Sequence, residues 1–537
     1  MAIFQLLFTP NKKLVGVHLK KITKLMQKSI AIWVLSLFLG ISGLWGQRII
    51  YSEPDRDDAR TLNFEIVGKM SGNVLIYKSY RDLHYMTVYD ADMKMTEKNR
   101  LEFMPEKVVD VELVQYPDFV YLYYQFQKRG IQYAMAVKLD AHGKKMAEPV
   151  VLDTTNMTGS NSNKVYSFLT SENKQQVLVF KISTKNDKLH LLTSLLFNKE
   201  LVLQKKSMIR VAMPERNDFL TEFALDNEGD LVCIRGSGTA QNDNINKISL
   251  ITKAAGADSV VVRNLKLTSI YLDDIRVKVD NVNKHYLVTS FYSKLRRGNI
   301  DGLYYSVWDK FQDKELATMN TIFTPDFRAD AKMEGNQKEA FNDFFLKNII
   351  LKKDGGFFIA AESAYSTSRG NALNRWDYLY GSPYYSTMYS PLDYYSYNSP
   401  LGFYPWSRYS MMNNNSVTRY FADNVVLLSF DKTGKMEWSN VIRKSQFDDN
   451  SDNFIGYGIL NTGDKAHFLF NIQDKRDMVL SDQSLYPDGQ IDRNPTFKNM
   501  DKGHEFMPRY GKQVGARQMI IPCQFRGSTC FAKIEFN

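Results

Sequence analysis

From Leu62 onward, short runs of apolar and aromatic residues alternate with polar turns. The clearest runs are NVLIYKSY from Asn73, DFVYLYYQFQ from Asp118, QQVLVFKIS from Gln175, HYLVTSFYSK from His285, GFFIAAES from Gly356, NVVLLSF from Asn424 and AHFLFNIQ from Ala466. Val, Ile, Phe and Tyr in runs of this length favour strands, and Asp, Asn and Gly clusters between them favour turns. No segment carries a sustained helical stripe. The sequence therefore predicts an all-β protein.

One turn pattern recurs between these runs. LDAHGK from Leu139, LDNEGD from Leu225 and FDKTGK from Phe430 each place Asp three residues before Gly, directly after an apolar run. The Asp carboxylate can accept hydrogen bonds from the backbone amides of the turn, and Gly can adopt the left-handed conformation that returns the chain. The pattern predicts hairpins along the whole chain.

The runs fall into groups of four, at a spacing typical of the blades of a β-propeller. The groups begin near Asn63, Lys107, Asn163, Phe219, Asp273, Phe341, Asn453 and Glu505. This count gives eight blades, although two soft boundaries leave seven open. The last group has room for three strands, so we expect RIIYSE from Arg48 to supply its fourth strand and close the ring.

The middle runs are apolar on both faces, as FVYLYYQF and VVLLSF show. Strands buried between neighbouring blades have this pattern. Strands of sheets with one solvent-exposed face, such as those of paired β-sandwich domains, instead alternate apolar and polar residues. LSFDKTGKMEWSNVI from Leu428 and VKLDAHGKKMAEPVVL from Val137 carry strand-Asp-x-x-Gly-strand hairpins. In these hairpins the chain resembles uncharacterised members of the secreted β-propeller superfamily of bacteria. The resemblance implies the fold of residues 62–537 and no particular function, because propellers include binding modules, scaffolds, lyases and hydrolases.

The N-terminal region has the layout of a secretory signal peptide over residues 1–46. Several lysines precede an apolar run from Ile30 to Leu39, and small residues follow before Gln47. MQKSIAIWVLSLFLGISGLWGQ from Met26 has the ordinary signal length by itself, so translation could start there. An uncleaved anchor is the alternative, but the apolar stretch is shorter than the ~20 residues of a spanning helix. We expect export of residues 47–537 to the periplasm, the outer membrane or the medium, with no transmembrane helix after signal removal.

Charge and cysteine content narrow the functional classes. The formal net charge is +10, and removal of the leader leaves 63 basic against 59 acidic residues without a basic cluster. Nucleic-acid binding is therefore not expected. Three cysteines do not make a disulfide framework. Cys523 and Cys530 face each other across a hairpin that turns at Arg526-Gly527, but at a hydrogen-bonded position that is less comfortable for a bridge, so we expect reduced thiols.

The most unusual segment is an expected insertion loop at residues 365–419, between a strand ending near Ser363 and a strand beginning near Tyr420. It holds ten tyrosines between residues 378 and 409, and four prolines that break regular structure. Tyr and Trp offer rigid area with a polar tip, which suits recognition. A space-filling or spacer role stays open. The candidate binding residues are Trp376, Tyr378, Tyr380, Tyr384, Tyr385, Tyr389, Tyr394, Tyr395, Tyr397, Phe403, Tyr404 and Trp406.

No catalytic motif stands out, and no catalytic residue is assigned. Asp448, Asp449, Asn450, Asp452 and Asn453 form an oxygen-rich loop that could hold Ca²⁺, but it lacks the Gly and distal Glu of an EF-hand, so no cofactor is expected.

The sequence predicts a binding or scaffolding module of the cell envelope that contacts a protein or a glycan through the aromatic insertion. The alternative is a polysaccharide hydrolase or lyase, with carboxylates such as Asp226, Asp273 and Asp274 converging in the propeller channel.

Overall fold

A computed structural model describes most of the chain after the leader. The described residues are 48–54, 63–157, 164–186, 188–238, 244–332, 335–368, 418–449, 452–474, 477–494, 497 and 503–536. Residues Ile49–Ile534 form one compact unit, and Met1–Arg48 with Glu535–Asn537 form another. The expected signal peptide lies outside the described residues.

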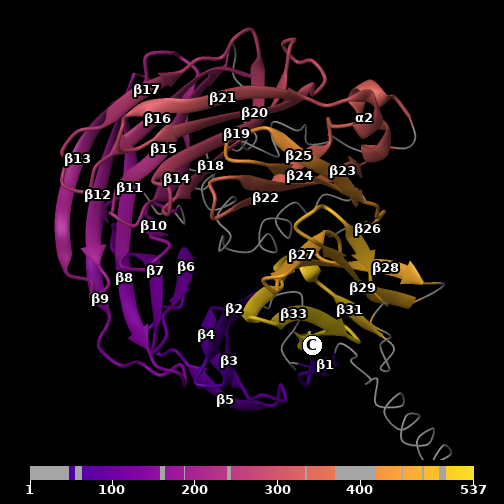
Figure 1. The fold of residues 1–537 in the computed structure, drawn as a ribbon. Coiled ribbons are helices and arrows are strands. Elements are labelled where there is room, and N and C mark those ends of the chain that lie inside the picture. Colours follow the sequence, from indigo (N-terminus) through magenta and orange to yellow (C-terminus); the bar gives the residue numbers. More distant parts are fainter. Residues whose placement is uncertain are drawn as a thin grey trace, which may run out of the picture. The chain divides into compact units, whose positions relative to one another are not determined.

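Consecutive strands of the large unit pair antiparallel in sheets (Figure 1). Blades 1 and 2 consist of β2 (Asn63–Met70), β3 (Asn73–Tyr80), β4 (Leu83–Tyr89) and β5 (Met95–Arg100), then β6 (Asp110–Gln115), β7 (Val120–Lys128), β8 (Ile131–Leu139) and β9 (Val150–Asn156). Blades 3 and 4 consist of β10 (Ser167–Thr170), β11 (Gln176–Asn186), β12 (Leu189–Asn198) and β13 (Leu203–Ala212), then β14 (Asp218–Leu225), β15 (Leu231–Gly238), β16 (Ile245–Lys253) and β17 (Val261–Leu265).

The remaining blades follow the same order. Blades 5 and 6 consist of β18 (Tyr271–Asp280), β19 (His285–Ser293), β20 (Gly302–Asp309) and β21 (Lys314–Ile322), then β22 (Phe344–Leu351), β23 (Phe357–Ser368), β24 (Thr418–Phe430) and β25 (Met436–Ile442), with β26 (Phe447–Asp449) beside β24. Blades 7 and 8 consist of β27 (Tyr457–Asn461), β28 (Ala466–Asp474), β29 (Asp477–Leu485) and β30 (Ile491–Arg493), then β31 (His504–Phe506), β32 (Lys512–Gly515), β33 (Gln518–Phe525), β34 (Ser528–Glu535) and β1 (Arg48–Tyr51).

The predicted β-propeller is confirmed, with eight blades in the described part of the chain. Each blade begins within a few residues of its predicted start. Blades 4 and 5 share one continuous sheet only through a single pairing of Ile245 with Leu272, so they remain separate groups of four. The short helices α2 (Pro325–Ala331), η1 (Gln337–Glu339) and η2 (Pro508–Tyr510) lie between blades or strands. No helix among the described residues has the length and hydropathy needed to cross a membrane.

The N-terminal strand closes the ring, as the sequence predicts. β1 pairs with β34 as the outermost strand of blade 8. The Ser52 amide donates to the Phe531 carbonyl at 2.8 Å, and the Phe531 amide donates to Ser52 Oγ at 3.0 Å. Because β34 belongs to the last hairpin, this contact joins the two ends of the repeat array.

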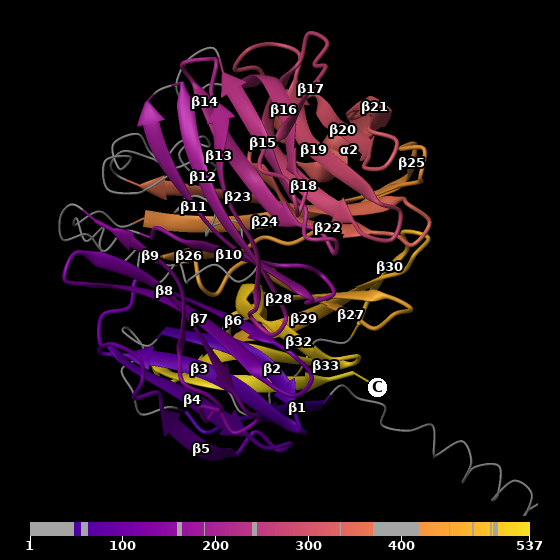
Figure 2. The same cartoon turned by 90° about the vertical axis from the view of Figure 1, so that its left-hand side faces the viewer.

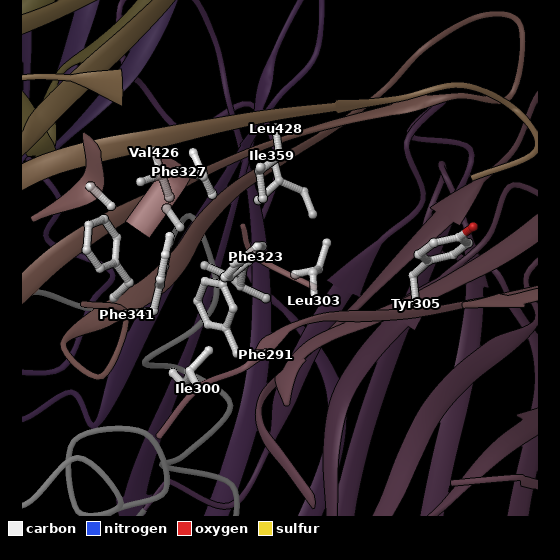
Figure 3. Packing of buried hydrophobic residues seen from close by; sticks show 14 of the residues in the cluster. Phe291, Ile300, Leu303, Tyr305, Phe323, Phe327, Phe341, Ile359, Val426 and Leu428 are labelled. Atoms are coloured by element: carbon white, nitrogen blue, oxygen red, sulfur yellow. The ribbon is translucent and has the colours of Figure 1, made fainter. Parts of the chain in front are cut away.

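Apolar clusters between neighbouring blades hold the ring together. Blades 5 and 6, for example, share a cluster in which Phe291 and Leu303 pack with Phe341 and Ile359 (Figure 3). Similar clusters join blades 1 and 2, 2 and 3, 3 and 4, 4 and 5, 6 and 7, and 8 and 1. The middle strands are therefore covered on both faces, which explains their continuous apolar runs.

The repeated Asp-x-x-Gly turns form as predicted. Asp431 Oδ1 accepts hydrogen bonds from the amides of Thr433 and Lys435, at 2.8 and 3.0 Å, and Gly434 has a φ of +81°. Asp140 and Asp226 cap their turns in the same way. A Cβ atom on Gly434 would lie only 1.4 Å from the Tyr305 hydroxyl of blade 5, so glycine is also required for packing between blades.

Strand direction divides the loops into two sets. Because every blade has four antiparallel strands, the turns between second and third strands lie at the same end as the connections between blades. We call this end the connection face. The turns between first and second, and between third and fourth, strands lie at the opposite end, the turn face.

Candidate functional site

In blade 6, β23 and β24 continue at the connection face past the residues that pair with β22 and β25. β23 and β24 stay paired as far as Ser368 and Thr418, and β26 adds a third strand with Phe447 opposite Phe421 (Figure 2). We call residues 364–368, 418–422 and 447–449 the blade-six extension. The two long strands thus reach further than the sequence-based limits near Ser363 and Tyr420. They continue to pair with each other past the ends of β22 and β25.

Exposed aromatic rings line the blade-six extension. Tyr365 is 39% exposed and stacks on Phe421, with ring centroids 4.6 Å apart and planes 10° apart. Phe447 is 53% exposed, and the Arg419 guanidinium lies 4.7 Å from the centre of its ring. Arg419 also donates two hydrogen bonds to Asp449, at 2.7 and 3.0 Å. This pairing holds the guanidinium over the ring and leaves an ordered patch of aromatic and charged groups.

A buried ion pair anchors the base of the extension. Lys444 Nζ lies 2.8 Å from Glu362 Oε1, and both side chains are almost fully buried. Lys444 also donates to the Ala422 carbonyl at 2.8 Å and to Gln446 Oε1 at 2.7 Å. Burial by itself would raise the pKa of Glu362, but the positive charges of Lys444, Arg509 and Lys347 hold it below its usual value. The chain that leads from β25 into β26 is therefore tied to β23 and β24.

Two carboxyl groups, one on each of two neighbouring innermost strands, are further candidates. Glu65 lies on β2 and Glu112 on β6, and burial raises the pKa of each to about 8. The positive charge of Lys512 partly offsets this effect at Glu65, and the negative charge of Asp110 adds to it. Glu65 Oε1 is buried without a hydrogen-bond partner among the described residues. We call Glu65 and Glu112 the inner-strand carboxyls; a carboxyl that keeps its proton near neutral pH can act as a general acid.

The acids proposed from the sequence do not come together. Asp226 caps a turn at the turn face and accepts a hydrogen bond from Lys310 at 2.6 Å. Asp274 lies near the start of β18, at the other end of the ring, where it accepts the Leu346 amide at 2.7 Å. Asp273 precedes it in the same irregular stretch of β18. Asp226 and Asp274 therefore serve as links within and between blades rather than as a facing pair.

Blade 7 contains a serine, a histidine and an aspartate in contact, but not in a nucleophilic arrangement. Ser484 Oγ lies 3.2 Å and Asp482 Oδ1 3.0 Å from the same atom, His467 Nδ1. A histidine that activates serine must bond serine with one ring nitrogen and the acid with the other. All three side chains are buried, so they form a hydrogen-bonded core group.

Two carboxylates of the oxygen-rich loop, for which no cofactor is expected, pair with arginines. Asp449 pairs with Arg419, and Asp452 pairs with Arg509. Burial raises the pKa of Asp448 to about 7. Asn450 lies outside the described residues, and the described part of the chain holds no group of three His, Cys, Asp or Glu side chains placed to bind a metal ion.

A polar cavity of about 510 Å³ lies beside α2, between this helix and the outer strands of blades 6 and 7. Asp330 and Arg443 line it and approach each other to 3.2 Å. Asp326 and Arg493 bring further charges of both signs. This mixed lining does not select a ligand of one charge.

All twelve predicted aromatic binding residues, from Trp376 to Trp406, lie outside the described residues, so their role stays a prediction. Two candidate residues are not predicted from the sequence: Phe447 on β26 and Glu65 on β2. Phe447 in KSQFDD directly precedes the oxygen-rich loop, and nothing in the local pattern marks it as exposed. Glu65 in NFEIVG reads as an ordinary polar position between two apolar residues. A carboxylate within an innermost strand is a signal that could have drawn attention to it.

Comparison with known proteins places the chain in no family. No family model matches it, and no curated protein matches it. Among solved structures, prolyl oligopeptidase B from Galerina marginata is 8% identical with a TM-score of 0.39, over 88% of this chain and 56% of that chain. An ulvan lyase of polysaccharide lyase family PL25 is 9% identical with a TM-score of 0.34, over 78% and 90% of the two chains. The chain thus spans little more than half of the peptidase, and likenesses this low assign no activity.

Proposed function

We propose that this protein is an exported binding module that contacts a partner protein through the blade-six extension and the tyrosine-rich segment it carries. The observation behind the proposal is the ordered, exposed aromatic patch around Tyr365 and Phe447. The exposed part of an aromatic side chain contributes no hydrophobic free energy unless another molecule covers it.

The composition of the patch favours a protein partner over a glycan. Tyr, Phe and Arg are enriched in protein interfaces and among their strongest contacts. Arg419 already covers one side of the Phe447 ring, which leaves less open ring surface for a sugar to stack on. The segment 369–417 adds aromatic residues with very few charges, as in paratopes.

The decisive experiment removes the segment without disturbing the ring. Residues 369–417 are replaced by Asn-Gly, a two-residue turn suited to the facing positions Ser368 and Thr418. Proteins crosslinked to the wild type in intact cells of the native source are then compared with those crosslinked to the deletion variant. We expect the deletion variant to keep the wild-type melting temperature and to lose the crosslinked partner.

Two point variants test whether crosslinking depends on the aromatic patch or on any exposed apolar side chain. Phe447→Ser lies in the blade-six extension, whereas Phe311→Ser changes a ring that is 73% exposed in a turn at the turn face. The first is expected to weaken crosslinking at least tenfold and the second to leave it unchanged. Equal crosslinking by the wild type and the deletion variant would refute the proposal, and binding on a glycan array without a protein partner would replace it with glycan recognition.

Acid–base chemistry on a polysaccharide is the second candidate function. It is favoured by the inner-strand carboxyls, whose raised pKa suits a general acid near neutral pH. Glycan cleavage that survives deletion of 369–417 but is lost in both Glu65→Gln and Glu112→Gln would support it. Cleavage unaffected by both substitutions would exclude these carboxyls.

A further inference from the structure

The last hairpin of the ring brings two of the three cysteines together. Cys523 lies on β33 and Cys530 on β34, their Sγ atoms are 2.6 Å apart, and both side chains are fully buried. The turn between the strands consists of Arg526 and Gly527, with φ of +51° and +80°. Positive φ at both positions marks the tight two-residue turn of a hairpin. The cysteines are therefore equally far from the turn and directly opposite each other.

The position in the ladder permits a disulfide bond. Hydrogen-bonded partners of an antiparallel pair have Cα atoms about 5.5 Å apart, within the range of about 4.4–6.8 Å found in disulfides. The sequence analysis argued only that a hydrogen-bonded position is less favourable for a disulfide, which does not exclude one. The structure adds that the Sγ atoms of the two side chains point at each other.

We propose that Cys523 and Cys530 form a disulfide bond in the exported protein. One thiolate attacks an external disulfide, from a low-molecular-weight compound or an oxidoreductase of the oxidising compartment, and forms a mixed disulfide. The second thiolate then displaces the external group. The two protons and two electrons of the cysteines leave with the external disulfide, which is released as two thiols.

The surroundings of the pair determine when the bond can form. The thiolate is the nucleophile, and burial raises the pKa of Cys523 well above its usual value. Oxidation therefore precedes the final packing of blade 8, and reductants reach the bond only after unfolding. Because β34 also pairs with β1, the bond stabilises the hairpin on which the N-terminal strand closes the ring.

A tryptic map of the native protein tests the bond directly. The full chain is taken from the envelope or medium of its native source, alkylated during denaturation and digested without reductant. Trypsin cuts after Arg517, Arg526 and Lys533, so peptides 518–526 and 527–533 each carry one cysteine of the pair. We expect one linked species that separates on reduction, whereas peptide 217–235 with Cys233 carries the alkyl group as an internal control. Alkylated Cys523 and Cys530 in the native protein would overturn the proposal.

A refolding experiment separates the bond from the question of export. The wild type is refolded with either oxidised or reduced glutathione, beside Cys523→Ala/Cys530→Ala and the control Cys233→Ala. We expect linkage and a melting temperature about 2 °C higher in the oxidised wild type, with the same gain in Cys233→Ala and none in the double variant. Free thiols after refolding with oxidised glutathione would overturn the proposal in any compartment. Neither readout depends on the partner proposed for the blade-six extension.

Discussion

The blade-six extension and the inner-strand carboxyls differ in burial. The aromatic rings of the extension stand partly in solvent, whereas Glu65 is buried with an oxygen that has no partner among the described residues. An exposed ring contributes little to stability and can be kept for binding. A buried carboxyl without a partner destabilises the fold whenever it ionises. The same propeller therefore holds a partly exposed aromatic surface and a buried carboxyl whose ionisation is unfavourable.

Disruption of the buried ion pair at the base of the extension should give the largest loss of stability. Lys444→Met leaves Glu362 buried without its main cation, which should lower the free energy of unfolding by about 3–5 kcal/mol. Denaturant unfolding followed by fluorescence measures the loss. Replacing both partners, in Lys444→Met/Glu362→Leu, should restore most of it. An unchanged midpoint in Lys444→Met would mean that the extension is not anchored through this pair.

The buried Glu65 carboxyl should make the free energy of unfolding depend on pH. The pKa of Glu65 is about 8 in the folded protein against 4.5 normally, so below pH 4.5 the group is protonated in both states and has no effect. Between pH 4.5 and 8 only the unfolded chain ionises, and stability falls as pH rises. Glu65→Gln removes this loss and should raise the free energy of unfolding at pH 9 by on the order of 3 kcal/mol, with little change at pH 4.5. The same gain at both pH values would point to packing instead of charge.

The exposed patch should give the smallest effect on stability. Phe447→Ser and Tyr365→Ser remove rings that are 53% and 39% exposed but lie in paired strands, so the free energy of unfolding should fall by no more than about 1 kcal/mol each. Calorimetry of the two variants beside the wild type checks this. A loss of several kcal/mol in either variant would show that the rings are structural, and the contrast between the two regions would disappear.

Local sequence was enough to predict most of the fold. The Asp-x-x-Gly turns at Asp140, Asp226 and Asp431 form as expected, because a capping carboxylate and a left-handed glycine act within a few residues. The pairing of β1 with blade 8 was also predictable, because the last group was one strand short. The candidate site could be predicted less well from the sequence. The predicted aromatic residues lie outside the described residues, and Asp226 and Asp274 proved to be structural.

The sequence by itself determined the strands, their turns, the blade spacing and the closing strand, because these depend on residues close together in the chain or on a simple count. Only the tertiary structure decided what faces each polar group. Alternation along β2 puts Glu65 on one side of its strand, but its pKa depends on burial and on the charges of Asp110 and Lys512 from other strands. Lys444 and Glu362 likewise meet only because three segments of blade 6 pack together. Desolvation and Coulomb interactions act through space, so a pattern along the chain does not contain them.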